Sequence, residues 1–517
     1  MPVETPCAAY SEAEGKWRRC RVAIEGEDSV KEAEEFCLPK PVGYTTEEYK
    51  AYLARATFFG AADRTVQGLA GAVLRKKGNQ ILPKKVEENL PKMGRSGESY
   101  PELKGRAVEE KLATGRLGVM VEAFKGKNAV PYLELWAAED IINWREEMVG
   151  SIMSPVEVVL RETYEVAEED DRFTREIKTR YRVLRLGIPI FPDAESAAKA
   201  GIPTEVPEGT MIYSQEVWEE HPVQVKDPVT GQEVTKTEYV HVDTLVPKIA
   251  GGITLDELPF YFAGKVTIEK PPMLDLINTN MAHYRNSADH EWGLHFTGLP
   301  TPWAAGFKVP EGGKLLIGST VAWLGEMGAE CGYLEFTGQG LNAIAQAMDS
   351  KKKEMAVQGA RLLEQSRPGV EAAEALQLRQ SGEQSVLANI ASDVSAALTK
   401  ALTMYARWLG VSESERAKIN VALNQDFNPA GVDSALLATL FGALQAGRLS
   451  PEVWFYNLQR GEVTPEDWTL EDELAAIDKA PPPSPASILP DPAEDEDEKD
   501  KDEEKAPKED KPAEPEE

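Results

Sequence analysis

The sequence predicts an α+β fold, and three observations lead to that class. Strand-like segments gather between residues 117 and 270, where apolar residues alternate with polar ones or form short apolar runs. Long helical patterns lie on both sides of this region, so helices and strands are segregated along the chain. A length of 517 residues with 42% hydrophobic residues exceeds one ordinary core, and we expect two to four domains.

The cysteines and the apolar segments limit the class of protein. The four cysteines lie far apart without a C-x-x-C pair, which indicates neither a structural zinc site nor a disulfide framework and fits a reducing compartment. They are Cys7, Cys20, Cys37 and Cys331. No apolar run approaches the roughly 20 residues that span a bilayer, and no signal-peptide pattern opens the chain. We therefore expect a soluble, unsecreted protein with no membrane partner.

The formal charge of −30 is the strongest compositional feature. Residues 491–517 hold fifteen acidic residues and five lysines, and from Pro481 onward the composition predicts disorder. Tight, sequence-independent DNA binding needs several contacts from Lys or Arg to phosphates, which so negative a surface opposes. The same charge suits a protein that DNA must pass without adhering.

The first part of the chain is predicted to be helical after an irregular arm. Residues 1–43 show no sustained period, and we expect an arm with a helix only around Ser29–Phe36. Thr45 can then cap a helix, with Glu48 as its capping-box partner. A further helix is predicted over Tyr100–Thr114.

From Leu117 the period becomes extended, and the chain predicts an antiparallel meander. Residues 188–270 continue it through long Pro- and Gly-rich connections, with Thr254–Lys270 returning to the sheet. The predicted strands are LGVMVEAF, PYLELWAAED, IINWREE, PVEVVLRETYEV and KTRYRVLRLG.

A long two-faced helix is predicted over Leu274–Phe296, with a length of about 36 Å. Thr297–Gly340 is rich in Gly and Pro and predicts small strands and tight turns. Gln339–Ser366 predicts a second long helix, which the breaker Arg367-Pro368-Gly369 ends. Glu383–Leu409 has the clearest amphipathic pattern in the chain, and shorter helices follow it.

The first long helix carries three histidines, a residue type that binds metal ions. His290 and His295 are five residues apart, whereas two ligands on one helix face need a spacing of four. His283 and His290 do share a face, and a metal bound with Asp289 is conceivable. Polar helix-face histidines at a subunit contact are the commoner arrangement. We therefore expect no metal here.

The sequence lacks the common catalytic signatures. It contains no phosphate-binding loop, no nucleophile elbow and no dinucleotide fingerprint, so we expect neither an enzyme nor a cofactor. The run Lys351-Lys352-Lys353 could touch phosphates, although such a run on a helix is usually solvated.

Four stretches together resemble a family of tailed-bacteriophage portal proteins. The resemblance covers roughly residues 44–480, and IINWR and HYRNSAD are its most specific parts. The stretches are TTEEYKAYLARATFFGAADRTVQGLAG, YLELWAAEDIINWREE, PPMLDLINTNMAHYRNSADHEWGLHFTGLPTPW and SGEQSVLANIASDVSAALTKALTMYARWLG.

The resemblance implies a homo-oligomeric ring, typically a dodecamer, at one capsid vertex of a virion that is assembled in the host cytoplasm. Such a ring is a channel for double-stranded DNA during packaging and ejection. The implied partners are the large terminase subunit, the major capsid and scaffolding proteins, and head–tail connector or adaptor proteins. Another phage head or tail protein, or a metal-dependent hydrolase using His283 and His290, remain the alternatives.

The resemblance also divides the chain into parts. These are an N-terminal arm (1–43), a wing (44–270), a first stem helix (271–296), a clip (297–338), a second stem helix (339–366), a tunnel loop (367–382), a long wing or crown helix (383–410), a crown (411–480) and an acidic tail (481–517). In the tunnel loop, the residues expected to face DNA are Arg367, Glu371, Glu374, Arg379 and Gln380. In the stem helices, the residues singled out are His283, Tyr284, Arg285, Asp289, Lys351, Lys352 and Lys353.

Overall fold

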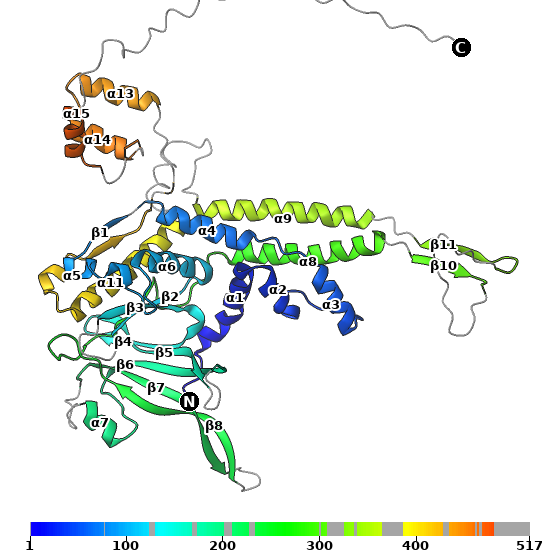
Figure 1. Ribbon diagram of the computed structural model, residues 1–517, viewed down its shortest axis with the longest axis horizontal. Coiled ribbons are helices and arrows are strands. Elements are labelled where there is room, and N and C mark those ends of the chain that lie inside the picture. Colours follow the sequence, from blue (N-terminus) through cyan, green and yellow to red (C-terminus); the bar gives the residue numbers. More distant parts are fainter. Residues whose placement is uncertain are drawn as a thin grey trace, which may run out of the picture. The chain divides into compact units, whose positions relative to one another are not determined.

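The α+β class is confirmed by a computed structural model of the chain (Figure 1). It divides into two units, Met1–Phe427 and Asn428–Glu517, which are described separately. The structure describes residues 2–76, 78–123, 130–167, 173–200, 209–226, 233–298, 301–307, 325–334, 339–363, 386–425, 427, 434–460, 463–464 and 468–479. In these ranges, no helix has the length and apolar character needed to cross a membrane.

The N-terminal arm is helical, so the expectation of an irregular segment was wrong. Helix α1 spans Ala8–Glu25 and is followed by α2 (Glu27–Glu32) and the 3₁₀ helix η1 (Glu34–Phe36). The apolar residues of α1 recur every three or four positions between charged ones, and they are buried. The indole of Trp17 is fully buried and donates a 3.1 Å hydrogen bond to the carbonyl of Thr114. The arm is therefore part of the core of the first unit.

The predicted helix starts are confirmed by their caps. Helix α3 (Thr46–Arg55) begins with the capping box of Thr45 and Glu48, in which each side chain accepts from the other residue's backbone N–H. Helix α4 (Ala61–Leu74) follows. Helix α6 spans Tyr100–Thr114 as predicted and ends at Gly115, whose φ of 75° favours glycine. Two short helical turns, α5 (Lys84–Glu87) and η2 (Leu90–Lys92), lie between them.

The antiparallel meander is confirmed in part, because the predicted strands LGVMVEAF and PYLELWAAED lie in a separate sheet. The five strands of the meander pair in chain order, each antiparallel to the next. They are β4 (Ile141–Val149), β5 (Ile152–Ala167), β6 (Arg175–Gly187), β7 (Ile212–Lys226) and β8 (Glu233–Leu245). The turn η3 (Ala138–Asp140) precedes β4, and helix α7 (Ala194–Ala200) lies between β6 and β7.

A smaller sheet has the order β3-β2-β9 and carries the expected return of the chain. Strand β2 (Leu117–Ala123) pairs with β3 (Pro131–Ala137) on one side and with β9 (Phe260–Phe262) on the other. Both pairings are antiparallel. Gly118 lets the Phe260 ring approach, because a Cβ at Gly118 would lie 2.1 Å from that ring.

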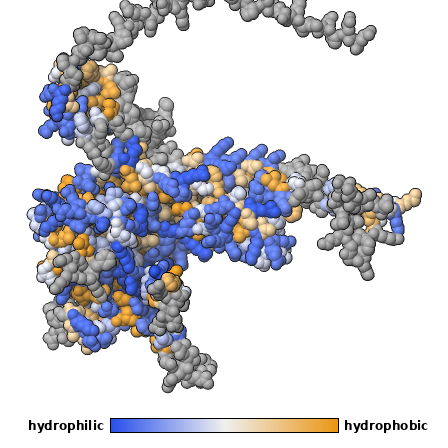
Figure 2. Space-filling view, in the orientation of Figure 1, coloured by the Kyte–Doolittle hydropathy of each residue, from blue (hydrophilic) through white to orange (hydrophobic). Residues whose placement is uncertain are grey.

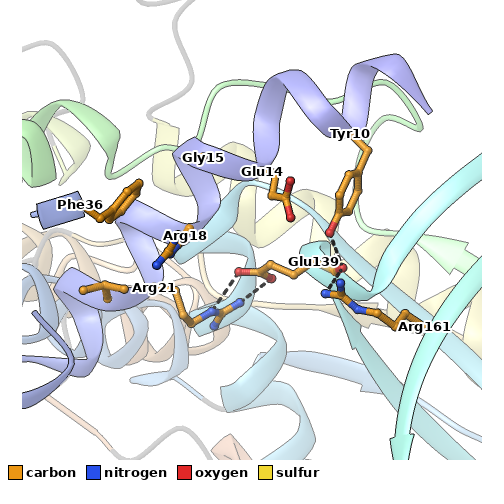
Figure 3. Close-up of a pocket in the computed structure, with 9 residues that line it drawn as sticks. Tyr10, Glu14, Gly15, Arg18, Arg21, Phe36, Glu139 and Arg161 are labelled. Atoms are coloured by element: carbon orange, nitrogen blue, oxygen red, sulfur yellow. Dashed lines mark hydrogen bonds and ion pairs between the residues drawn. The ribbon is translucent and has the colours of Figure 1, made fainter. Parts of the chain in front are cut away.

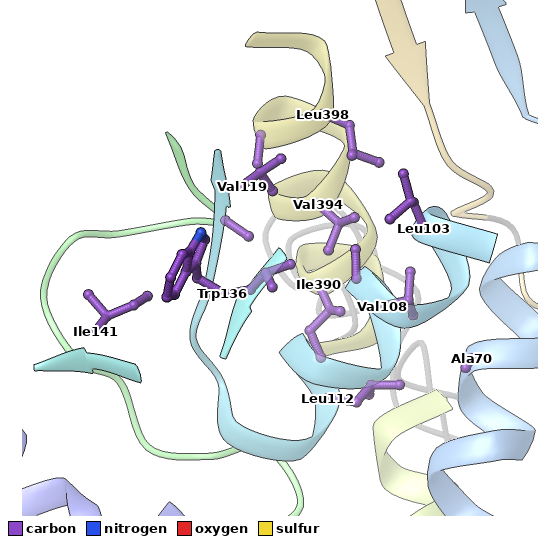
Figure 4. Packing of buried hydrophobic residues seen from close by; sticks show 14 of the residues in the cluster. Ala70, Leu103, Val108, Leu112, Val119, Trp136, Ile141, Ile390, Val394 and Leu398 are labelled. Carbon is purple, nitrogen blue, oxygen red and sulfur yellow. The ribbon is translucent and has the colours of Figure 1, made fainter. Parts of the chain in front are cut away.

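The main core lies between this smaller sheet and two helices (Figure 4). Helix α11 (Val386–Trp408) packs against α6 and the sheet. The ammonium of buried Lys111 donates to the carbonyls of Gly115 and Ala263 and lies 3.1 Å from the carboxylate of Asp393. One lysine thus joins α6, the β9 region and α11. The apolar side chains in this core include Leu103, Val108, Leu112, Val119, Trp136, Ile390, Val394 and Leu398.

After α11 the first unit ends with small elements that sequence patterns did not predict. Helix α12 (Glu413–Arg416) leads to β12 (Asn420–Ala422), which pairs antiparallel with β1 (Asn79–Ile81). The second unit contains α13 (Ser434–Gln445), α14 (Pro451–Arg460) and α15 (Leu470–Lys479). The shorter helices expected after α11 are therefore confirmed.

Candidate functional site

A helical hairpin is the main candidate for a functional surface. Helices α8 (Leu274–Gly298) and α9 (Gln339–Leu363) each contain 25 residues and lie side by side (Figure 1). At 1.5 Å per residue, each is about 37 Å long. Between them in the chain, β10 (Thr301–Ala305) and β11 (Glu330–Leu334) form an antiparallel pair. Both long helices and the small strands between them were predicted.

The two ends of α8 differ in their surroundings. The apolar residues of its first part are buried, including Ile277, Met281 and Tyr284. After Asp289 the helix has no buried residue, and Leu294 and Phe296 are exposed. Helix α8 is therefore fixed at its base, while its far end leaves apolar side chains uncovered in the single chain.

Polar contacts fix the base of α8 to α3 and to the segment after it. The hydroxyl of Tyr52 donates a 2.6 Å hydrogen bond to Asp289, and the Ser287 hydroxyl donates 2.6 Å to the carbonyl of Thr57. Burial, followed by the bond to Asp289, raises the pKa of Tyr52 well above its ordinary value. Trp292 packs against Tyr52 with ring centroids 5.9 Å apart.

The N-terminal segment contacts the same helix. Arg19 donates 2.8 Å to the side-chain oxygen of Asn278, and Arg285 donates 3.3 Å to the carbonyl of Cys37. Tyr284 is fully buried against Phe58. The predicted stem residues Tyr284, Arg285 and Asp289 therefore all contact their own chain at the base of the hairpin.

His283 is buried within its own chain, which corrects the expectation of a polar helix-face histidine at a subunit contact. Its side chain is 3% exposed and packs 5.6 Å from the ring of Phe59. Within the part of the chain that the structure describes, neither ring nitrogen has a hydrogen-bond partner. Burial, and then the charges of Lys352 and Lys351, lower the pKa of His283.

The metal hypothesis finds no support in this geometry. His290 is partly buried, with Nδ1 3.6 Å from a carboxylate oxygen of its neighbour Glu291. Two lysines near His283 would repel a divalent cation. Across the described ranges, no three His, Cys, Asp or Glu side chains are grouped to hold a metal ion.

The three lysines of the run lie on α9 and differ in their exposure. Lys351 is half-buried, whereas Lys352 and Lys353 are exposed. The ammonium of Lys352 lies 5.5 Å from the centre of the Phe59 ring and 3.8 Å from Asp349. The five tunnel-loop residues, from Arg367 to Gln380, lie outside the described residues.

A buried arginine network connects the two sheets. It was not predicted from the sequence. Arg182 on β6 is 2.8 Å from Glu122, 3.1 Å from Glu134 and 3.2 Å from Glu162. Burial alone would raise the pKa of Glu162, but Arg182, Arg180 and Arg95 outweigh burial and lower it to about 2. The sequence feature that could have indicated this network is the alternation of arginines with apolar residues along β6.

A pocket of about 420 Å³ lies where α1 meets η3 and β5 (Figure 3). Arg21 pairs with Glu110 at 2.8 Å and with Glu139 at 2.9 Å. Tyr10 and Arg161 each donate 2.9 Å to the backbone carbonyl of Glu139. Arg21 and Glu139 in the pocket are paired with other charged side chains of the same chain. We therefore interpret the pocket as a structural contact between the N-terminal arm and the sheet.

Comparisons with known proteins give one family model and several solved structures. No curated protein matches the chain. A family model described as a domain of unknown function (DUF4055) matches residues 272–409, from the start of α8 to the end of α11. That range contains the HYRNSAD segment.

Three solved structures are similar to the chain at low identity. The virion of a native gene transfer agent particle has a chain with 15% identity and a TM-score of 0.34, covering 83% of this chain and 98% of that one. The neck of the native particle, computed with C12 symmetry, has a chain with 16% identity and a TM-score of 0.35. The match covers 81% of this chain and 95% of that one. The neck of the empty particle, computed with C6 symmetry, has a chain with 16% identity and a TM-score of 0.35. The match covers 78% of this chain and 90% of that one.

Proposed function

We propose that this chain is a phage portal subunit. Copies of it form a ring, of twelve subunits as in the family it resembles, at one vertex of a capsid, and the ring is the channel for packaging and ejection of double-stranded DNA. Residues 44–270 are the wing, α8 and α9 the stem, and the segment between them the clip.

The observation that carries this proposal is the helical hairpin. Its base is held by contacts such as Tyr52 to Asp289, whereas Leu294, Phe296 and Trp303 at its far part are exposed. Neighbouring copies can cover these side chains if the hairpins stand side by side. A repeated head-to-tail contact of this kind closes into a ring when the rotation allows it.

Charge gives independent support. A chain with a formal charge of −30 would repel the phosphates of passing DNA over most of its surface. Exposed Lys352 and Lys353 on α9 are then local exceptions that can guide DNA without holding it. The tunnel segment, with Arg367, Glu371, Glu374, Arg379 and Gln380, is proposed to meet the DNA as well.

The mechanism that follows is passive. The ring is a conduit and a docking platform, with the large terminase subunit supplying ATP hydrolysis during packaging. Head–tail connector proteins dock later, and capsid and scaffolding proteins surround the ring. No catalytic residue and no cofactor are proposed for this chain.

Electron microscopy of the purified full chain tests the proposal. Negative-stain images should show rings with a central hole, and native mass spectrometry should give one main oligomer. Discrete monomers that bind zinc stoichiometrically would instead favour a metal-dependent hydrolase. Filaments or closed shells would favour a different head or tail component.

A further inference from the structure

The second unit leaves its large apolar side chains uncovered. Among the described residues of this unit, one large apolar side chain is buried, that of Phe455, which is 6% exposed. Figure 2 shows orange, apolar surface over α13 and α14. Apolar residues that are exposed include Phe441, Val453, Tyr456, Val463, Leu474 and Ile477. A unit with so little of its apolar surface buried needs another surface to cover it.

Size explains why the unit cannot cover itself. Its three helices span residues 434–479, which is only a little longer than the length of about 40 residues below which units usually need disulfides, metals or oligomerisation to be stable. The unit contains no cysteine. Contiguous exposed apolar surface on such a unit marks an interaction site.

The exposed residues form two separate surfaces. On α15, Leu470, Leu474 and Ile477 are spaced by four and three residues and lie on one face; we call this face the α15 stripe. Leu474 is 48% and Ile477 is 59% exposed.

The other surface lies on α13 and α14. Phe441 packs 5.9 Å from the ring of Trp454, next to Val453, and Tyr456 lies one turn further along α14. We call Phe441, Val453 and Tyr456 the α13–α14 patch. Tyrosine and other aromatic residues are the side chains most often found at the centres of interfaces.

Within one copy, the two surfaces do not cover each other. The side chain of Gln459 at the end of α14 donates 2.7 Å to the carbonyl of Trp468, just before α15. The indole of Trp468 donates 2.7 Å to Glu473 on α15. With α15 tied in this way, the α15 stripe and the α13–α14 patch are both exposed.

The composition of the acidic tail argues against the tail as the segment that covers these two surfaces. Between residues 480 and 517, the large apolar residues are Ile488 and Leu489 alone, among prolines and charges. Charge favours a second copy. The α15 stripe is flanked by Glu471, Asp472 and Asp478, whereas exposed Arg448 lies between α13 and α14.

We propose that the α15 stripe of one copy packs on the α13–α14 patch of the next copy. This inference rests on the ring of the proposed function and names a contact that holds it together. Because the two surfaces differ, each copy offers one and receives the other, which is the heterologous contact that a closed ring requires.

Site-directed cross-linking in the full chain tests the contact. In a Cys331→Ser background, which removes the exposed native thiol, Tyr456→Cys is combined with Leu474→Cys and treated with a short bifunctional maleimide. We expect a ladder of covalent multimers on a denaturing gel, and only background from either cysteine alone. The matched control combines Tyr456→Cys with Ala476→Cys, which lies about 200° around α15 from Leu474 and should give no ladder.

The outcomes separate this inference from the function on which it rests. Rings seen by microscopy without a ladder above the control would overturn the contact and leave the portal proposal standing. Cross-links within one chain would show that the stripe folds back on its own copy, which also overturns it. If no rings form, the portal proposal fails and the contact fails with it.

Discussion

The hydroxyl of Tyr52 donates a 2.6 Å hydrogen bond to the carboxylate of Asp289, joining α3 to α8 across 237 positions of sequence. Tyr52 is 4% exposed, so water does not easily replace it. Replacing Tyr52 by Phe removes the donor and keeps the ring. We expect a loss of about 1 to 3 kcal/mol in the free energy of unfolding, measured by chemical denaturation. Tyr333→Phe on exposed β11 is the control, and an equal effect there would contradict a specific role for the bond.

The pH dependence of stability should report on His283. Its pKa is lowered in the folded chain, so below about pH 6.5 the unfolded chain takes up a proton that the folded chain resists. Stability is therefore retained at neutral pH and lost as the pH falls, by at most about 1.4 kcal/mol per pH unit for one group. His283→Leu should flatten this slope between pH 7.5 and 5.5 in thermal unfolding. A slope that persists in His283→Leu would refute the assignment.

Arg182 should be one of the most sensitive positions of the first unit. Its removal leaves Glu122, Glu134 and Glu162 close together without their shared buried cation. Arg182→Ala should cost about 3 to 5 kcal/mol in the free energy of unfolding. Arg175→Ala breaks an exposed pair with Glu165 and should cost less than about 1 kcal/mol. Similar losses for the two variants would argue against a buried network.

Acid should act on the same network through Glu162. Its pKa of about 2 lies below the ordinary value of 4.5, so its contribution is fully present above about pH 4.5 and is lost as the pH falls toward 2. Glu162→Gln should therefore lower stability at neutral pH and reduce the further loss between pH 4.5 and 2. Unfolding measured by circular dichroism across this range checks the difference.

The proposed DNA channel makes a prediction about the tunnel segment. Combined replacement of Arg379 and Gln380 by Ala should leave ring formation intact and reduce the amount of DNA packaged per particle. An assay of nuclease-protected DNA measures this amount. Replacement of Lys479, which closes α15, serves as a control outside the segment. Unchanged packaging and ejection would remove the claim for these two residues.

Local signals explain which elements could be predicted from the sequence. Ser99 with Glu102 starts α6 and Gly115 ends it, so three residues close together in the chain define that helix. Helix α1 was missed because its buried residues, such as Trp17, are separated by charged ones and its partner is α6, far along the chain.

The site was harder to predict because its contacts are long-range. The length of the hairpin followed from helical periodicity. The burial of His283 did not, since it depends on Phe59 from another segment. The arginines of β6 were visible in the sequence, but Arg182 finds its carboxylates on β2, β3 and β5, between 20 and 60 residues away, and no pattern indicates such partners.

The position of Lys111 has a consequence for how the chain folds during synthesis. Its ammonium joins residues near 111, 263 and 393, so the core cannot close until α11 has left the ribosome. The hairpin is made before the core that anchors it. Until then, the apolar faces of β2 and β3 remain open, and contacts of such long separation form slowly. Newly made chains are therefore most prone to aggregate in the interval between the synthesis of α9 and that of α11.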